Sequence, residues 1–286
     1  MSLSEKITGF YQNYLEGRIR FTAFIIAKEL VISSIKEKKF LFALLYFTII
    51  PMLILLLTSN PDVIQTGSGI ALYYAQHNTV DFIKNYFFSL IMGQILIVIL
   101  TADQISGEFE QTTFVLLRTK PVYDSEIVYG KFFGIMSFLM ILDVFTICGV
   151  FLSNMSTYEA ETEAYIGTID ELVVALFIIA LLQSLIVSMT LLISSFFSRS
   201  LYAILSSMIS LFIINIFTID YDPSSEKLNL FSFPWLIDAI FPQFFYHMDV
   251  LPFSIPSLLE FIIGILFVTN LLLGAAILRI RLREVY

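Results

Sequence analysis

The chain has 286 residues, of which 58% are hydrophobic and only 14% are charged, and its mean hydropathy is +0.86. Soluble domains are about 45–50% apolar and about 25% charged, so this composition excludes an ordinary water-soluble enzyme. The formal net charge of −8, taken as a whole, argues against nucleic acid as a partner. Because Cys148 is the single cysteine and there are only two histidines, we expect neither a disulfide framework nor a metal site.

Residues 1–39 are predicted to form a cytoplasmic N-terminal segment with an amphipathic helix. Charges occur throughout this segment, and it contains neither the compact apolar run nor the cleavage site of a secretory signal, so we expect it to be retained. On a helical wheel its polar side chains fall within about 60° of one another on an otherwise apolar surface. This narrow stripe favours a helix lying along the membrane interface, and a solvated juxtamembrane helix is the alternative. The stripe consists of Arg18, Thr22, Glu29, Ser33 and Lys36, and the charged residues we assign to the helix are Arg18, Lys28, Glu29 and Lys36.

Six segments are apolar enough to cross a bilayer, whose hydrocarbon core of about 30 Å requires roughly 20 helical residues. Each is nearly free of charge and is flanked by polar residues, Pro or Gly, and none alternates strictly as a strand would. We therefore predict an all-α integral membrane protein with a transmembrane domain over residues 40–286. The predicted spans are residues 40–58, 86–102, 132–153, 172–197, 201–218 and 258–278.

The distribution of basic residues predicts the orientation, because cytoplasmic loops are rich in Lys and Arg. With both termini in the cytoplasm, the cytoplasmic pieces hold 14 of the 16 Lys and Arg residues and 10 acidic ones, whereas the external pieces hold 2 basic and 12 acidic residues. The cytoplasmic face is then mildly basic and suits anionic membrane lipid. The internal loop is 103–131, and the external pieces include the loops 154–171 and 219–257. Ser198-Arg199-Ser200 form a tight turn between spans four and five.

The internal loop predicts a helix over about residues 105–118 that ends before Pro121, which cannot donate the next backbone hydrogen bond. Phe114 falls on the polar face of this helix. There it either fits a groove of a partner protein or packs back onto the chain's own helices. The apolar face holds Ile105, Phe109, Thr112 and Leu116, and the polar face holds Asp103, Gly107, Glu110, Gln111 and Arg118.

One set of positions in this loop forms a distinctive pattern: Ile105, Glu108, Glu110, Thr113, Leu116, Leu117, Pro121, Val122, Glu126, Ile127, Gly130 and Lys131. It resembles the loop after span two in the permease subunits of type-2 ATP-binding-cassette exporters, which are six-span proteins that dimerise and are driven by a separate ATPase. This chain has Thr112 where that family usually has a glycine. Weaker matches are Lys28-Glu29-Leu30 and the segment 192–200.

The resemblance implies a function, partners and a location. The loop helix becomes a coupling helix, seated with the N-terminal interfacial helix in a cleft of the ATPase. Two ATP-binding subunits hold ATP and Mg, and a second permease copy or a homologue completes an export pathway in the plasma membrane. The implied coupling residues are Glu108, Phe109, Glu110, Thr113, Phe114, Leu116, Leu117 and Pro121.

The chain itself lacks the phosphate loop of an ATPase, since Gly130-Lys131 precedes Phe132 and has no glycine at the required upstream position. We therefore expect a permease subunit that is not an enzyme and carries no cofactor of its own.

Two ionisable residues lie within predicted spans, Asp143 in span three and Glu260 at the start of span six. An aspartate at mid-helix costs roughly 2.5–3.5 kcal/mol on insertion. Asp143 is either a proton or cation site or a buried carboxylate bonded to a nearby Ser, Thr or Tyr, and Glu260 is expected to be hydrated near the interface. The alternative functions are an ion-coupled secondary transporter or channel that uses Asp143, and a membrane scaffold that transports nothing.

Single amides and several serines also occur within the spans. By resemblance, spans one, two and five face the dimer interface, which makes Gln94, Asn215 and Ser207 candidate pathway residues. The alternative is that these small and polar side chains only allow close helix packing.

Overall fold

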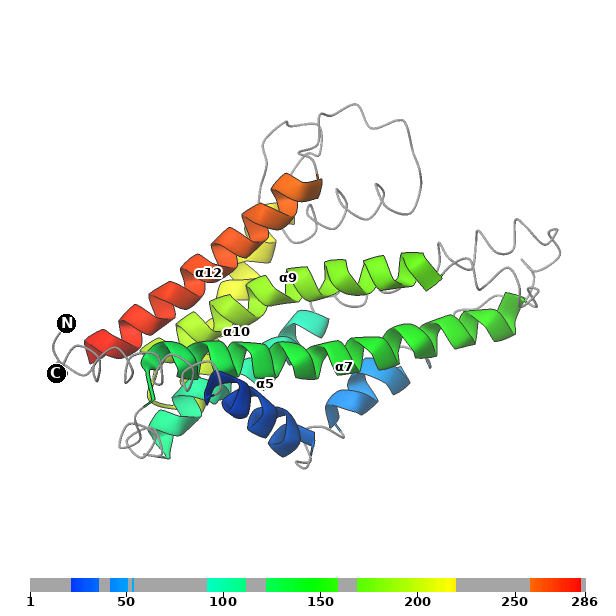
Figure 1. Cartoon of the computed structure of the whole chain (residues 1–286). Coiled ribbons are helices and arrows are strands. Elements are labelled where there is room, and N and C mark those ends of the chain that lie inside the picture. Colours follow the sequence, from blue (N-terminus) through cyan, green and yellow to red (C-terminus); the bar gives the residue numbers. More distant parts are fainter. Residues whose placement is uncertain are drawn as a thin grey trace, which may run out of the picture.

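The computed structural model describes residues 22–35, 42–50, 53, 92–111, 122–158, 169–219 and 258–283. Every regular element in these ranges is helical, which confirms the predicted all-α class for the part described (Figure 1). An N-terminal helix covers residues 22–35 and a short π-helical turn, η1, covers Leu45–Ile49. The long helices are α5 (Met92–Glu110), α7 (Asp124–Tyr158), α9 (Ile169–Phe196), α10 (Ser200–Ile219) and α12 (Leu258–Leu282).

Helix α9 lies at the centre of the bundle and contacts α5, α7, α10 and α12. Its middle is mostly apolar, with a few buried polar side chains such as Gln183. Side chains are buried on every face of it, among them Ile179, Leu182 and Ile186. By contrast, α12 exposes large apolar side chains such as Phe267, Leu271 and Leu278, which suit contact with lipid tails.

Three described helices are long and apolar enough to cross a membrane, and they fall in predicted spans three, four and six: Asp124–Phe151, Leu176–Phe196 and Ile262–Leu282. The described apolar part of α10, Ser200–Ile214, is shorter. Predicted spans 40–58 and 86–102 are only partly within the described residues, so the count of six spans stays a prediction.

The helices around the internal loop extend beyond the predicted spans. Helix α5 continues past Ala102 to Glu110, so the first residues of the predicted coupling helix belong to the span-two helix rather than to a separate one. Helix α7 begins at Asp124 instead of 132, and Glu126 in its first turn accepts a hydrogen bond from the backbone N–H of Tyr123 at 3.1 Å. A prediction from hydropathy ends a span at the first charged residue, whereas a helix continues as long as its backbone hydrogen bonds are formed.

The turn between α9 and α10 is as tight as predicted, with Phe197, Ser198 and Arg199 between the two helices and Ser200 as the first residue of α10. At this same end of the bundle α5 and α12 end and α7 begins (Figure 1). Consecutive antiparallel spans require this gathering of ends. It brings the described part of the coupling segment next to α7, α9, α10 and the end of α12.

Candidate functional site

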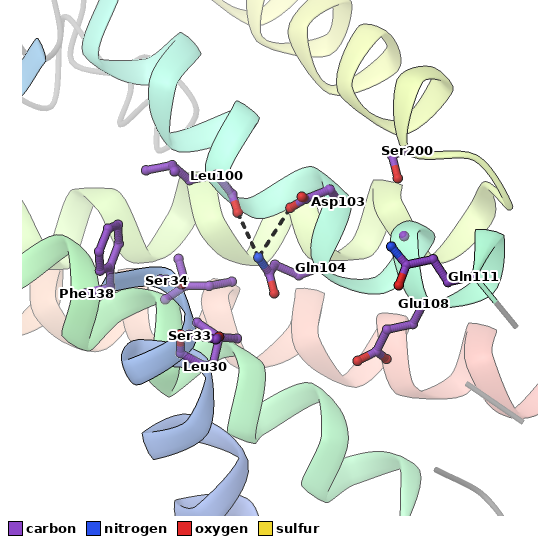
Figure 2. Close-up of a pocket in the computed structure, with 12 residues that line it drawn as sticks. Leu30, Ser33, Ser34, Leu100, Asp103, Gln104, Glu108, Gln111, Phe138 and Ser200 are labelled. Atoms are coloured by element: carbon purple, nitrogen blue, oxygen red, sulfur yellow. Dashed lines mark hydrogen bonds between the residues drawn. The ribbon is translucent and has the colours of Figure 1, made fainter. Parts of the chain in front are cut away.

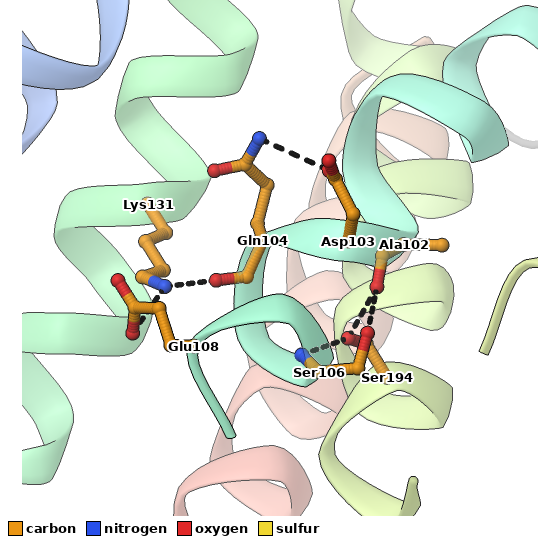
Figure 3. Close-up of polar contacts among 7 residues, drawn as sticks. All are labelled: Ala102, Asp103, Gln104, Ser106, Glu108, Lys131 and Ser194. Atoms are coloured by element: carbon orange, nitrogen blue, oxygen red, sulfur yellow. Dashed lines mark hydrogen bonds and ion pairs between the residues drawn. The ribbon is translucent and has the colours of Figure 1, made fainter. Parts of the chain in front are cut away.

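A buried ion pair joins the end of α5 to the start of α7 (Figure 3). The Lys131 ammonium nitrogen lies 2.7 Å from Glu108 Oε2 and also donates to the backbone carbonyl of Gln104. The Lys131 side chain is almost fully buried, whereas Glu108 is about a quarter exposed. Glu108 and Lys131 both belong to the sequence pattern of the internal loop, and the structure shows that these two charged residues pair with each other. They hold α5 and α7 together at the level of the coupling residues.

Glu110 connects α5 to the first turn of α10. Its Oε2 accepts the backbone N–H of Ser200 at 2.9 Å and the Ser200 hydroxyl at 3.0 Å. The N–H of a first helical residue has no partner within its own helix, so an acid at this position satisfies it. The backbone and hydroxyl bonds from Ser200, together with the charge of Arg199, hold the pKa of Glu110 below its usual value.

Ser194 of α9 inserts its hydroxyl into the backbone of α5 (Figure 3). The hydroxyl donates to the carbonyl of Ala102 at 2.6 Å and accepts the N–H of Ser106 at 3.0 Å. The Ser106 hydroxyl donates to the same carbonyl at 2.7 Å. Since Ala102 and Ser106 are one helical turn apart, α9 is attached to α5 at a site where a helix can bend.

Arg283, directly after α12, ties three helix ends together. Its guanidinium carbon lies 4.2 Å from the centre of the Phe109 ring, a cation–π contact. It also donates to the carbonyls of Ser195 and Phe197 at 3.3 Å each, and to the Ser198 hydroxyl at 2.5 Å. A cation suits the free carbonyls at the end of α9, and burial lowers the pKa of Arg283. We call these contacts of residues 102–110 with Lys131, Ser194, Ser200 and Arg283 the junction.

A polar cavity of about 320 Å³ lies beside the junction (Figure 2). The N-terminal helix contributes Leu30, Ser33 and Ser34 to its wall, so this helix and the end of α5 face one space. At roughly 30 Å³ per water molecule, the cavity has room for several waters. The remaining wall is formed by Leu100, Asp103, Gln104, Gly107, Glu108, Gln111, Ile135, Phe138 and Ser200.

The N-terminal helix packs closely on α7 over two glycines spaced four residues apart. A Cβ atom added at Gly130 would lie 3.0 Å from both the Ala23 carbonyl oxygen and Ile26 Cβ. One added at Gly134 would lie 3.1 Å from Ala27 Cα. Two glycines at this spacing let helix backbones approach closely. Gly130 and Gly134 therefore set the position of the N-terminal helix.

The predicted site residues fall into three groups. Glu108, Phe109 and Glu110 meet at the junction, and Lys28 and Glu29 are exposed on the N-terminal helix away from the cavity wall. Gln94 on α5 and Ser207 on α10 are buried in helices that contact each other, so within one chain neither faces an open pathway. Outside the described residues lie Arg18, Lys36, Thr113, Phe114, Leu116, Leu117, Pro121 and the side chain of Asn215.

Asp143 differs from its expected environment. Its carboxylate accepts a hydrogen bond from the side-chain amide of Gln183 at 3.0 Å, not from a Ser, Thr or Tyr. The hydroxyl nearest along α7, Thr146, donates instead to the carbonyls of Phe47 and Leu142. Such back-bonding is common for Thr in helices and removes it as a partner for the acid.

Several residues of the junction were not predicted as site residues from the sequence. From the sequence, Lys131 is predicted only as part of the loop pattern and Ser200 only as part of the turn after span four, whereas nothing singles out Ser194 or Arg283 as a site residue. The Gly130-x-x-x-Gly134 spacing is a signal that identifies the close packing on α7. The other pairings join residues far apart in sequence and leave no periodic signal.

Comparison with known proteins finds a similarity that extends over most of the chain. The sequence pattern of one family, described as ABC-2 family transporter protein, matches residues 23–273. A search among curated proteins gave no match. The matched range contains the N-terminal helix, the junction helices α5, α7, α9 and α10, and most of α12. The chain therefore belongs to the ABC-2 transporter family, as a membrane-embedded transport component that is not itself catalytic and whose family implies an ATP-binding partner.

Proposed function

We propose that this chain is the permease subunit of an ATP-driven exporter and that the junction transmits the motion of its ATPase to the membrane helices. Family membership supports the class of transporter. The single observation that carries the coupling role is that residues 102–110 contact α7, α9, α10 and the end of α12 through an ion pair, hydrogen bonds and a cation–π contact.

These contacts indicate the order in which a displacement passes from one helix to the next. The coupling segment, residues 105–118, begins inside α5, so a displacement at Glu110 reaches the rest of α5 along one continuous helix. Lys131 then passes this displacement to α7, and Glu110 passes it to the start of α10. Because packed helices are bistable rather than continuously deformable, small shifts here become a change of access elsewhere.

The partner ATPase supplies the energy. Two ATP-binding subunits, holding ATP and Mg, close around nucleotide and move the coupling segment together with the N-terminal helix. The shared cavity between these two elements supports a common docking region, since Ser33 and Gln111 line one space. A second permease copy or a homologue completes the pathway, and substrate moves out of the cytoplasm across the plasma membrane, with anionic lipid against the basic face.

The test is reconstitution with candidate ATP-binding subunits. Phe114→Ala removes an aromatic side chain that we place in the ATPase cleft, and loss of such an anchor costs about 2 kcal/mol, or roughly thirtyfold in affinity. We expect co-purification of the ATPase and its stimulation by the permease to fall together.

The matched control is Phe267→Ala, the same substitution at a side chain exposed on α12, which should leave both measurements unchanged. A wild-type permease that never co-purifies with an ATP-binding subunit contradicts the proposal. So does transport that persists after ATP depletion and depends on an ion gradient.

A further inference from the structure

Two fully buried side chains face each other across the α7–α9 contact in the middle of the bundle. Asp143 on α7 and Gln183 on α9 both have no solvent exposure. The amide nitrogen Nε2 of Gln183 lies 3.0 Å from Asp143 Oδ1 and donates to it. A carboxyl group and a carboxamide are both planar, with two polar atoms each, so one contact leaves one polar atom on each group to be satisfied.

Neither remaining atom has a hydrogen-bond partner among the described residues. These atoms are Asp143 Oδ2 and Gln183 Oε1, and both are oxygens. If the acid were ionised, both would be acceptors facing no donor, and each buried acceptor left without a partner costs about 1–3 kcal/mol. An uncompensated charge within a membrane span adds to this cost.

Among the described residues, no nearby charge compensates an anion at this level. The elements packed against α7 are the N-terminal helix, α5, α9, α12 and η1, and η1 has no charged residue. The charged residues of the N-terminal helix, Lys28 and Glu29, are exposed, and this helix meets α7 at Gly130 and Gly134, nine or more residues before Asp143. Lys131 precedes Asp143 by twelve residues on α7, and Glu171 precedes Gln183 by twelve on α9, a separation of about 18 Å along each helix. The other charged residues of these helices lie near the helix ends or in the second half of α5: Asp124, Glu126, Asp170, Asp103, Glu108, Glu110, Glu260, Arg279 and Arg281.

We propose that Asp143 is a proton-binding site and that the neutral acid forms a reciprocal pair with Gln183. A hydronium ion supplies the proton: one of its O–H bonds breaks, it leaves as water, and the proton bonds to Oδ2, while no bond within the protein breaks. The Oδ2–H group then donates to Gln183 Oε1 while Gln183 Nε2 continues to donate to Oδ1. A single proton thus satisfies both unpartnered oxygens and removes the buried charge.

The pair fastens α7 to α9 in the middle of the membrane-spanning part. This contact is independent of the junction and of any ATPase, so it does not rest on the proposed function. In the resting protein Asp143 therefore carries a proton and is neutral. A cation site would instead require the ionised carboxylate.

The experiment is infrared spectroscopy of the purified full-length protein at neutral pH, in the region where protonated carboxylic acids absorb apart from carboxylates. We expect a wild-type band that moves on carboxyl-¹³C labelling of aspartate and is missing in Asp143→Asn. Gln183→Leu should shift the band to higher frequency, because the carbonyl of the acid loses its hydrogen bond. Asp124→Asn, the same substitution at the start of α7, should leave the band unchanged.

The proposal is overturned if the folded wild type has no such aspartate band, or if Gln183→Leu leaves the band where it was. The labelled wild type and Gln183→Leu decide the matter even if Asp143→Asn does not fold. Thermal unfolding provides a second measurement. The amide of Asn in Asp143→Asn can make both hydrogen bonds with Gln183, so the melting temperature of this variant should stay close to that of the wild type. Asp143→Leu can make neither bond, so its melting temperature should fall.

Discussion

Lys131 is the residue on which the end of α5 depends most directly. Its ammonium group is buried and touches two acceptors of α5, the Glu108 carboxylate and the Gln104 carbonyl. A buried cation is tolerated only when its partners are placed to meet it, and removal of one partner leaves the other group uncompensated. Lys131 and Glu108 therefore form one unit, and their substitutions must be interpreted together.

Lys131→Met keeps the length of the side chain and removes its charge. We expect it to destabilise the protein by about 1–3 kcal/mol, because Glu108 and the Gln104 carbonyl lose their donor. Lys28→Met, the same substitution at an exposed position of the N-terminal helix, is the control and should have little effect. The measurement is the free energy of unfolding in detergent.

Glu108→Gln alone and with Lys131→Met completes a double-mutant cycle. The double variant should lose less stability than the two single losses added together, since Glu108→Gln removes the uncompensated charge. Strictly additive losses would mean that the 2.7 Å contact contributes nothing to stability.

At the scale of elements, the N-terminal helix acts as a part of the bundle rather than as a separate anchor. Ala23, Ile26 and Ala27 rest on Gly130 and Gly134 of α7, so this helix follows the start of α7. Its outer side remains apolar at Phe24 and Ile32, which agrees with a helix lying against the membrane interface.

Alanine at Gly130 and Gly134 should loosen this packing. Added Cβ atoms would lie 3.0–3.2 Å from atoms of the N-terminal helix, several of them in its backbone, so the helix must move away. At each site, overpacking typically costs about 1–3 kcal/mol, and the better helix propensity of Ala offsets roughly 1 kcal/mol of that cost. We expect faster tryptic cleavage after Lys28 in the double variant.

Gly274→Ala on α12 is the matched control, because a Cβ atom there meets nothing within 4 Å. It should be neutral or slightly stabilising. Equal cleavage rates in Gly130→Ala/Gly134→Ala and wild type would show that the close approach does not hold the helix.

How far the sequence predicts these elements depends on the range of the interaction. Apolar runs predicted the helices and the tight α9–α10 turn, and the periodicity of the internal loop correctly placed Ile105 in the core and Glu110 on the exposed side. Hydropathy could not extend α5 beyond Ala102, because the charged Asp103 follows. The pairing of Asp143 with Gln183 could not be predicted either, because each helix carries several polar side chains and only the packing selects which two meet.

At the scale of the whole molecule, the ends gathered at the junction define one face of the bundle. The α9–α10 turn, the end of α5 and Arg283 all lie there. The positive-inside pattern predicts that this face is cytoplasmic, since the predicted topology puts 14 of 16 basic residues on that side. The sidedness of the junction is thus a prediction about the entire chain, and a single labelled position on each face tests it.

Cysteine labelling in intact cells makes this test. In a Cys148→Ser background, which removes the one native thiol, Arg199→Cys places a thiol in the exposed α9–α10 turn and Glu161→Cys places one in the loop 154–171. A membrane-impermeant maleimide should label position 161 in intact cells and position 199 only after permeabilisation, because translocating the basic face is unfavourable. The opposite pattern would put the junction outside the cell, out of reach of ATP, and would remove the physical basis of coupling at Glu108 and Lys131.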